Sequence, residues 1–227
     1  MRLGARRAAG GAPYARSRPP ARRTPWRDAS WCSLDFELTG LNPERDEIIS
    51  FGAVPIDGGR VGLSGAVSGL VRPAGEIGEA SIRVHEIRAA DLADAPTLSE
   101  ALPALLDAIA GRVLVVHTAA VEREFLGRAL SEAGLRLRGP IADTEVLGRL
   151  WLHEHEQRLR GHVGLAELAH ALGLPADRPH DALGDALTTA QVFLALASHL
   201  DAAHPETVGS LTRAERRLAG VRLFHGH

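Results

Sequence analysis

The stretch Trp31–Leu41, WCSLDFELTGL, decides how the rest of the chain is interpreted. Its apolar residues, and the Gly, Asn and Pro residues that bound it, predict a β-strand over about 31–38. Two carboxylates, Asp35 and Glu37, stand two residues apart in this strand. Residues i and i+2 of a strand point to the same face, so the two acids should project side by side.

This pair of acids has two interpretations. Two like charges held so close repel each other, and burying either one costs several kcal/mol unless a cation lies between them. Carboxylate oxygens at a strand end suit Mg²⁺ or Mn²⁺. The alternative is a solvent-facing edge strand that carries two acids.

The composition indicates one sizeable domain with tails, because the chain has 227 residues of which 45% are hydrophobic. No apolar run approaches ~18 residues, so we expect no membrane span and a cytoplasmic protein. A single cysteine, Cys32, excludes an internal disulfide and a cysteine-rich zinc site. We interpret it as a small buried residue of the first strand.

The net charge of −2 conceals an uneven distribution. Residues 1–27 hold eight arginines and no acid, which leaves 18 arginines against 28 acids in the rest of the chain. An acidic body does not favour general affinity for duplex DNA. It fits a site crowded with carboxylates that receives a substrate phosphate through bound metal.

Local patterns divide the chain into a disordered Arg-rich tail (1–28), a domain (29–200) and a C-terminal extension (201–227). Strands followed by helices that alternate with buried strands predict an α/β sheet with helices on its faces. The predicted strands are 31–38, 46–56, 61–71, 113–116 and a short one ending near 141. The predicted helices are 82–87, 97–110, 121–133, 143–151, 165–172, 181–200 and a weaker one within 209–219.

Three more candidate residues lie at helix starts. Glu122 falls in the first turn of the helix after the buried strand 113–116, and Asp185 falls in the first turns of the long helix. His180 precedes that helix in a loop, with Asp181 as its N-cap candidate. The alternatives are exposed acids stabilised by the helix dipole and a solvated histidine. Thr39 and Gly40 follow the first strand and could place a backbone N–H near a substrate.

Together these residues form a recognisable set of motifs. LDFELTGL (34–41) followed by DEIISFGAV (46–54), VVHTAAVEREFL (115–126) and HDALGDA (180–186) resemble, in this order, the three exonuclease motifs of the DEDDh family. That family includes the ε proofreading subunit of bacterial DNA polymerase III, ribonuclease T and oligoribonuclease. The resemblance covers about 31–197. Smaller similarities are VHEI (84–87), Ala95-Pro96 and Asp143-Thr144.

The resemblance implies a ribonuclease H-like mixed sheet, with three antiparallel strands and then parallel ones. It also implies two Mg²⁺ or Mn²⁺ ions about 3.5–4 Å apart. Asp35 would bridge both ions, Glu37 and Asp185 would complete the shell of one, and Glu122 would hold the other. His180 would be the general base. The implied reaction releases nucleoside 5′-monophosphates stepwise from a 3′ end.

The implied substrate is the 3′ end of single-stranded DNA or RNA, and a DNA polymerase is a candidate partner. The terminal nucleotide needs a pocket, and we expect Phe36, Leu38 and Leu41 to line it together with Thr39 and Gly40. Ordinary core packing is the alternative for Phe36 and Leu38, because these two side chains should face away from the acids.

The second motif departs from the family pattern. Glu122 stands where aspartate is usual, Thr118 where asparagine is usual, and Val121 where phenylalanine is usual. A glutamate keeps the charge but adds a methylene. Two alternatives therefore stay open: a catalytically weakened nucleic-acid-binding or polymerase-associated module on the same fold, and an oligoribonuclease-like RNA-processing enzyme.

The polar stretch His153–His162 is interpreted as a loop. Its three histidines, at 153, 155 and 162, could bind zinc with Glu154 and Glu156, although a solvated loop near the mouth of the site is the simpler interpretation. Arg158 and Arg160 are candidates for contact with a substrate phosphate.

Overall fold

The computed structural model describes residues 11–155, 162–175 and 180–224. Its centre is one mixed sheet with the strand order β3-β2-β1-β5-β6, in which β4 also pairs with β2. The antiparallel pairs are β1–β2, β2–β3 and β2–β4, and the parallel pairs are β1–β5 and β5–β6. The predicted α/β architecture is confirmed. The strands are β1 (Trp31–Leu38), β2 (Ile48–Asp57), β3 (Arg60–Val61), β4 (Val67–Leu70), β5 (Val113–Val116) and β6 (Ile141–Asp143).

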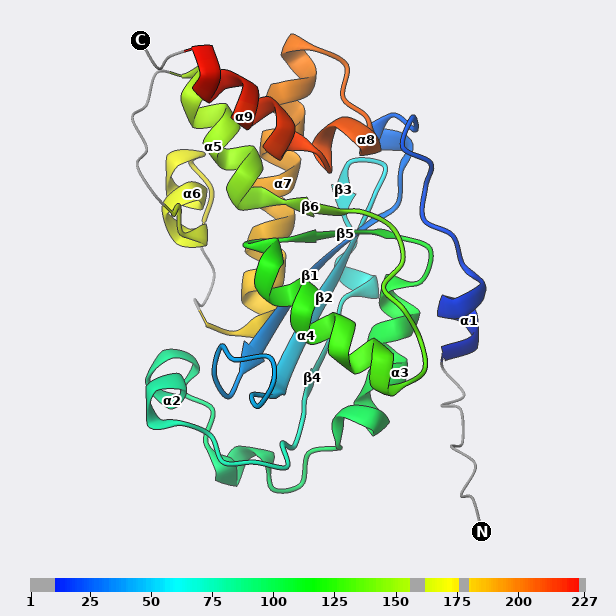
Figure 1. Ribbon diagram of the computed structural model, residues 1–227, viewed down its shortest axis with the longest axis vertical. Coiled ribbons are helices and arrows are strands. Elements are labelled where there is room, and N and C mark those ends of the chain that lie inside the picture. The colour runs from blue at the N-terminus through cyan, green and yellow to red at the C-terminus, as the bar shows by residue number, and fades with distance from the viewer. Residues whose placement is uncertain (1–10, 156–161, 176–179, 225–227) are drawn as a thin grey trace.

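The predicted third strand, 61–71, is two short strands in the structure. A 3₁₀ turn over Leu63–Gly65 separates β3 from β4. Both pieces pair with β2, because the long β2 offers its whole edge to them (Figure 1). The prediction of one continuous strand is therefore wrong, and that of an antiparallel partner for β2 is confirmed.

Helices cover both faces of the sheet (Figure 1). Thr97 and Glu100 form the predicted capping box, and Asp181 is the N-cap of the long helix. The predicted loop 153–162 begins inside a helix, since His153 and Glu154 are helical. The helices are α1 (Gly11–Arg16), α2 (Glu79–His85), α3 (Leu98–Ile109), α4 (Ala119–Glu132), α5 (Thr144–Glu154), α6 (Leu165–Ala171), α7 (Ala182–Ala203), α8 (Val208–Leu211) and α9 (Ala214–Phe224).

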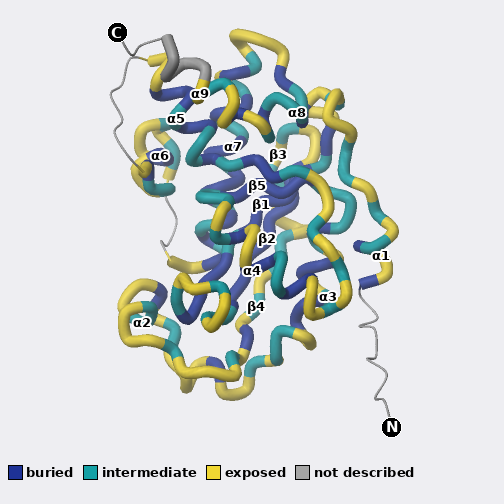
Figure 2. The backbone as a smooth tube through the Cα atoms, in the orientation of Figure 1, coloured by how far each residue is buried: buried dark blue, intermediate teal, exposed yellow. Residues whose placement is uncertain are grey.

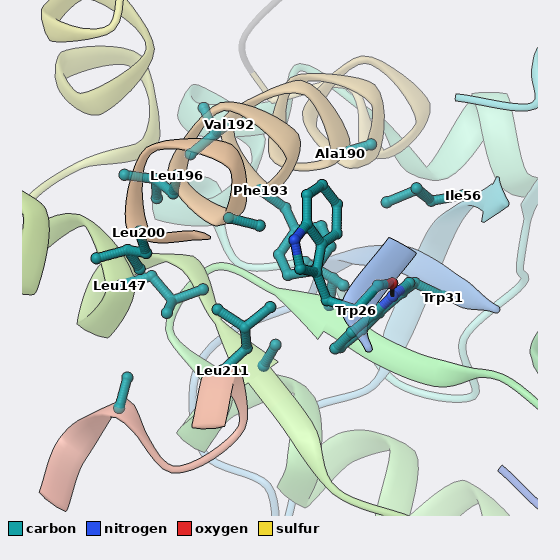
Figure 3. Close-up of a cluster of buried hydrophobic side chains, with 14 of the residues drawn as sticks. Trp26, Trp31, Ile56, Leu147, Ala190, Val192, Phe193, Leu196, Leu200 and Leu211 are labelled. Atoms are coloured by element: carbon teal, nitrogen blue, oxygen red, sulfur yellow. Dashed lines mark hydrogen bonds between the residues drawn. The ribbon is translucent and has the colours of Figure 1, made fainter. Parts of the chain in front are cut away.

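Strand alternation sorts the apolar residues into two cores. On one face, Trp31, Val54 and Ile56 pack with the buried side of α7, where Phe193 meets the Trp31 ring at 4.7 Å between centroids (Figure 3). On the other face, Cys32 and Leu34 pack with α3 and α4. The buried backbone of the central strands in Figure 2 lies between these two layers.

The N-terminal flank is ordered where the structure describes it, so the predicted disorder of 1–28 is wrong for residues 11–28. Tyr14 is buried, its hydroxyl donating to the Arg136 carbonyl at 3.2 Å and accepting from the Arg138 N–H at 3.0 Å. Trp26 is only 1% exposed. These two large aromatic side chains anchor the flank, and the average composition of 1–28 does not reveal them. Residues 1–10 lie outside the described part of the chain.

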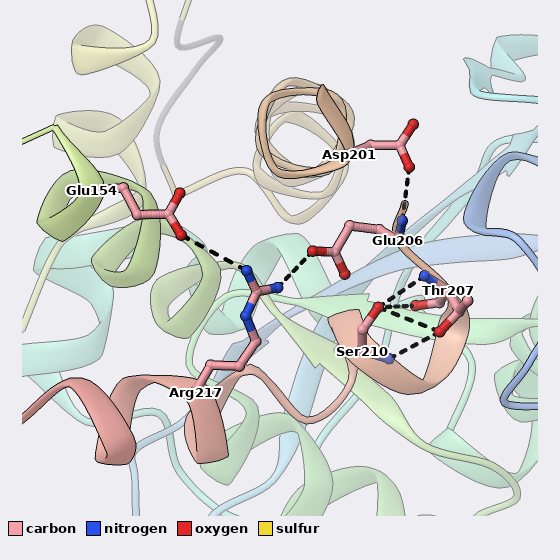
Figure 4. A network of polar contacts seen from close by, with 6 residues as sticks. All are labelled: Glu154, Asp201, Glu206, Thr207, Ser210 and Arg217. Carbon is pink, nitrogen blue, oxygen red and sulfur yellow. Dashed lines mark hydrogen bonds and ion pairs between the residues drawn. The ribbon is translucent and has the colours of Figure 1, made fainter. Parts of the chain in front are cut away.

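The C-terminal extension packs on the same core. Val208, Leu211 and Ala214 are buried in the cluster that contains Trp26. The weaker helix predicted within 209–219 is two helices, α8 and α9. Arg217 of α9 pairs with the buried Glu206 and reaches Glu154 of α5 at 3.7 Å (Figure 4). The two flanks thus close one end of the sheet together.

Within the described residues, no helix has both the length and the apolar character that crossing a membrane requires.

Candidate active site

The site begins on β1, where Asp35 and Glu37 share a face. Their Cα atoms pair with those of Gly52 and Ser50 on β2. Leu34, Phe36 and Leu38 point the other way, into the core of α3 and α4. The side-by-side projection predicted from the sequence is confirmed.

A glycine on β2 lets the long helix reach these acids. A Cβ placed on Gly52 would lie 2.2 Å from the carbonyl oxygen of Ala182, the first residue of α7. Only a residue without a side chain permits that approach. The first turn of α7 therefore lies against the sheet beside Asp35, and Asp185 from this turn joins Asp35 and Glu37. Ligand oxygens of the three carboxylates lie within 4.8 Å of one another, the one such group of metal-ligating side chains in the described residues.

The start of α7 is held by the motif that contains His180. Asp181 caps the helix by accepting from the Gly184 N–H at 3.3 Å. His180 has φ +67°, and its backbone N–H donates to Asp185 Oδ2 at 2.9 Å. This bond fixes one oxygen of Asp185, while the imidazole of His180 is exposed. His180 lies in the loop before the helix, as predicted.

Glu122 approaches Asp35 from α4. It lies in the first turn of that helix and is only 7% exposed, and its Oε2 atom has no hydrogen-bond partner. Among the charged neighbours that raise the pKa of Asp35, Glu122 has the largest effect. The structure therefore brings Glu122 to the same centre as Asp35, Glu37 and Asp185, although its oxygens lie outside the tight group of three.

Asp143 positions Glu122, a function that the sequence did not reveal. Its carboxylate accepts from the N–H groups of Thr118 at 3.1 Å and Ala119 at 2.8 Å, and so caps α4. The same carboxylate accepts from the Glu145 N–H at 2.9 Å and caps α5. One side chain thus fixes both helix starts, three residues before Glu122. The Asp143-Thr144 pair was visible only as a small similarity to the family.

Burial raises the pKa values of all four carboxylates, and repulsion from neighbouring acids adds to this effect. Burial first, and then Asp185 and Asp181, raise the pKa of Glu37 to about 7. Burial, with a further contribution from Asp143, raises the pKa of Glu122 to about 8. The pKa values of Asp35 and Asp185 are also raised, chiefly by burial. The folded protein therefore disfavours full ionisation of the group in the absence of a cation.

These observations fit a divalent metal site. Oxygen donors alone surround the centre, which suits Mg²⁺ or Mn²⁺. The buried Oε2 atom of Glu122 lacks any protein partner, and clustered acids with raised pKa values are the arrangement that a cation relieves.

The predicted substrate-binding residues divide into two groups. Phe36 and Leu38 are 8% exposed and belong to the core on the face opposite to the acids. Thr39 is buried; its hydroxyl lies 3.3 Å from Asp46 Oδ1, and its carbonyl accepts from Ser81 of α2 at 2.7 Å. Leu41 is 77% exposed at the end of β1.

Gly40 lies directly against Asp46, whose carboxylate would be 2.5 Å from a Cβ at that position. The turn 39–46, which joins β1 to β2, is therefore a tightly bonded unit that also contacts α2.

The second motif is anchored by His117. Its Nδ1 lies 2.9 Å from Thr144 Oγ1 and its Nε2 lies 2.9 Å from the Val163 carbonyl oxygen. Burial lowers the pKa of His117. Thr118, in the position where the family has asparagine, adopts φ +69°.

The histidines of 153–162 do not assemble into a metal group among the described residues, since the carboxylate group described above is the one found there. His162 instead lies 3.1 Å from Glu145, and His155 Nδ1 lies 2.8 Å from the Trp151 carbonyl oxygen. Arg158 and Arg160 lie outside the described residues.

Comparison with known proteins gives a consistent result. The family model described as "Exonuclease" matches residues 32–193. The chain is 36% identical over 168 residues to the PolC-type DNA polymerase III of Thermotoga maritima, covering 74% of this chain and 12% of that one. It is 35% identical over 197 residues to a DNA polymerase III subunit epsilon-like protein of Rhodobacter capsulatus, covering 86% and 27%. The chain thus spans about a quarter or less of these relatives.

A shorter relative and two solved structures extend this comparison. The DNA polymerase III subunit epsilon of Aquifex aeolicus is 28% identical, with 76% of this chain and 83% of that one covered. Exonuclease X in complex with 5′ overhanging duplex DNA has a TM-score of 0.62 at 20% identity, covering 81% and 98%. The nuclease domain of 3′hExo, a DEDDh family member bound to rAMP, has a TM-score of 0.61 at 19% identity, covering 78% and 94%. The fold is therefore ribonuclease H-like, and the chain belongs to the exonuclease family.

Proposed function

We propose that this chain is a divalent-metal-dependent 3′–5′ exonuclease that acts on single-stranded nucleic acid and releases nucleoside 5′-monophosphates. The observation that carries the proposal is the convergence of Asp35, Glu37 and Asp185 within 4.8 Å, with the buried, unpartnered Glu122 beside them. Such a group of oxygen donors has no structural purpose that would offset its repulsion.

Two Mg²⁺ or Mn²⁺ ions would be held by Asp35, Glu37, Glu122 and Asp185. When bound, these ions supply an activated water and a stabilised leaving oxygen at the scissile phosphate. The carboxylates would orient the phosphate indirectly, through the ions that they hold.

His180 is the proposed general base. Two observations support this role: the residue is exposed, and its backbone N–H is bonded to the Asp185 carboxylate. Histidine suits proton removal from a water near neutral pH because its ordinary pKa is close to 6.5. The proton leaves the attacking water for the imidazole and passes on to solvent.

Thr39, Gly40 and Leu41 are the proposed contacts for the terminal nucleotide. They lie in the turn that follows the acids, and Leu41 exposes an apolar side chain there. Phe36 and Leu38 support this turn from the core. DNA is the preferred substrate in this proposal, and a DNA polymerase the candidate partner, because the relatives named above are DNA polymerase III proteins. Cytoplasmic location stays a prediction.

Purified protein, 5′-labelled single strands and Mn²⁺ or Mg²⁺ test the proposal. We expect a ladder of products shortened from the 3′ end, accompanied by nucleoside 5′-monophosphates, and no product with Asp35→Asn. Parallel DNA, RNA and dinucleotide substrates distinguish a DNA enzyme from an oligoribonuclease-like one. An intact strand at high protein concentration would instead identify the non-catalytic module.

A further inference from the structure

Three arginines gather where the two flanks of the chain meet. The backbone of Arg22 lies on α8, since the Gly209 N–H donates to the Arg22 carbonyl at 2.7 Å. A Cβ on Gly209 would lie 3.2 Å from the Cβ of Arg22. Arg213 and Arg216 follow α8 and stand three residues apart, with the Arg216 N–H bonded to the Arg213 carbonyl at 3.0 Å. We call Arg22, Arg213 and Arg216 the arginine cluster.

The charges of the arginine cluster are not neutralised. All three residues are exposed. In the part of the chain that the structure describes, no carboxylate forms an ion pair with any of them. Two nearby arginines differ in this respect: Arg27 lies 3.8 Å from Asp201, and Arg217 pairs with Glu206.

The three charges of the cluster repel one another. The pKa of Arg213 is lowered, first by the charge of Arg22 and also by that of Arg216. The rest of the chain after residue 27 is strongly acidic. An unpaired positive cluster on an acidic body is a surface that a polyanion complements.

The cluster lies outside the part of the chain that the exonuclease family model matches, residues 32–193. It is built by the flanks, which Figure 1 shows side by side at α8. It also lies near the first residues of β1. The Trp26 N–H donates to the Glu206 carbonyl, and the Trp26 carbonyl accepts from the Trp31 indole N–H. From Trp31 to Glu37 the strand rises on the order of 20 Å, so the cluster and the carboxylates are at opposite ends of β1.

We propose that the arginine cluster is a second nucleic-acid contact surface, which binds backbone phosphates of the substrate strand several nucleotides from the 3′ end held at the carboxylates. This inference rests on the proposed function for the identity of the polyanion. Arginine binds phosphate through paired N–H donors, and three such contacts add affinity without sequence preference. A strand that spans both sites binds more tightly than a fragment that fills the active site alone.

The test measures binding by fluorescence anisotropy with a labelled 20-nucleotide strand and a labelled trinucleotide. Ca²⁺ replaces Mg²⁺ or Mn²⁺, so that the carboxylate site holds a cation without the ions proposed for catalysis. The triple variant Arg22→Gln, Arg213→Gln, Arg216→Gln is compared with Arg60→Gln, Arg88→Gln, Arg136→Gln, which removes the same charge from scattered exposed positions. We expect the first variant to weaken binding of the 20-mer about tenfold at low salt, and to reduce the slope of log Kd against log salt by about 2. Trinucleotide binding should not change, and the scattered variant should keep the slope of the wild type.

A triple Arg→Lys variant at the cluster serves as the rescue, since it keeps the charge; matching circular dichroism melting curves show that all variants are folded. Equal 20-mer affinity in the wild type and the Gln variant overturns the proposal, as does equal loss in the scattered variant. Heparin serves as a second polyanion. If the Gln variant loses affinity for heparin but keeps its affinity for nucleic acid, the proposal is overturned in favour of another polyanion. Failure of the proposed exonuclease function is seen separately, as absent hydrolysis by the wild type with Mn²⁺.

Discussion

Glu122 shows how a single residue can couple stability to pH. Between its ordinary pKa of 4.5 and its folded value of about 8, the folded protein keeps a proton on this carboxyl that the unfolded chain has released. The unfolded state then binds fewer protons, so stability falls as pH rises through this window. Glu37, with a folded pKa of about 7, acts in the same direction.

Metal-free protein should therefore be more stable at pH 5 than at pH 8, and Glu122→Gln should flatten this decline. The buried carboxyl is expected to account for roughly 3–4 kcal/mol between pH 5 and pH 8. Chemical denaturation in EDTA at several pH values measures it. Stability that increases between pH 5 and 8, or an unchanged profile in Glu122→Gln, contradicts this account of the site.

Thr118 stores strain at the start of α4. A β-branched residue at φ +69° is unfavourable, whereas asparagine tolerates the left-handed region. We expect Thr118→Asn to stabilise the protein by about 1 kcal/mol, as measured by urea denaturation. Thr118→Ser is the comparison, because it keeps the hydroxyl and should gain little stability. A destabilised Thr118→Asn variant would show that the hydroxyl contact to Glu145 at 3.5 Å outweighs the strain.

At the scale of elements, α4 and α7 deliver half of the site, and each depends on one residue. Asp143 fixes the start of α4. Replacing it with alanine should destabilise the fold by about 1–2 kcal/mol, the usual effect of losing a helix cap. Because Glu122 then shifts, kcat should fall about 10²-fold with little change in KM. Asp143→Asn keeps one acceptor oxygen, so its kcat should lie between those of the wild type and Asp143→Ala. Equal kcat in all three proteins would refute the positioning role.

Gly52 performs the corresponding task for α7. The Gly52→Ala variant places a methyl group against the Ala182 carbonyl and should destabilise the protein by about 1–3 kcal/mol while displacing Asp185. Gly127→Ala is the matched control, since a Cβ there meets nothing within 4 Å and the residue lies inside α4. Thermal denaturation and Mn²⁺ titration measure both effects. Intact Mn²⁺ affinity in Gly52→Ala would contradict the packing argument.

The elements also show what the sequence reveals and what it conceals. The period-two pattern of 31–38 and the apolar run 113–116 are local, and both strands have the predicted limits. Asp143 caps both α4 and α5 because the starts of these two helices meet in the fold. No local sequence pattern predicts that meeting. Gly52 carries a weak signal, because a glycine inside a strand indicates close approach of another backbone. The sequence marks the break between β3 and β4 only by the glycines of 61–71, and the structure places the 3₁₀ turn Leu63–Gly65 there.

At the scale of the whole molecule, the flanks are part of the folded unit. Composition predicts disorder for an Arg-rich, Pro-rich segment, yet the buried side chains of Tyr14 and Trp26 anchor residues 11–28 to the domain. Trp26 packs edge-on to Phe193 with 6.1 Å between ring centroids, and its backbone bonds to Glu206. The N-terminal flank, the C-terminal flank and α7 therefore share one core.

Trp26→Ala should cost about 3–5 kcal/mol of unfolding free energy, the usual effect of truncating a fully buried tryptophan. Denaturant unfolding measures this, and Trp26→Phe should recover part of the loss. A loss below about 1 kcal/mol would mean that the flank is attached to the domain without supporting it.

The central claim is that Glu122 completes a catalytic carboxylate set in the place where the family has aspartate. It is tested most directly by measuring kcat for 3′-terminal nucleotide release from a single strand, with Mn²⁺, in the wild type, Glu122→Asp and Glu122→Gln. The account predicts activity in the wild type, retained activity in Glu122→Asp, and a loss of at least about 10²-fold in Glu122→Gln. Equal rates in Glu122→Gln and the wild type would contradict it.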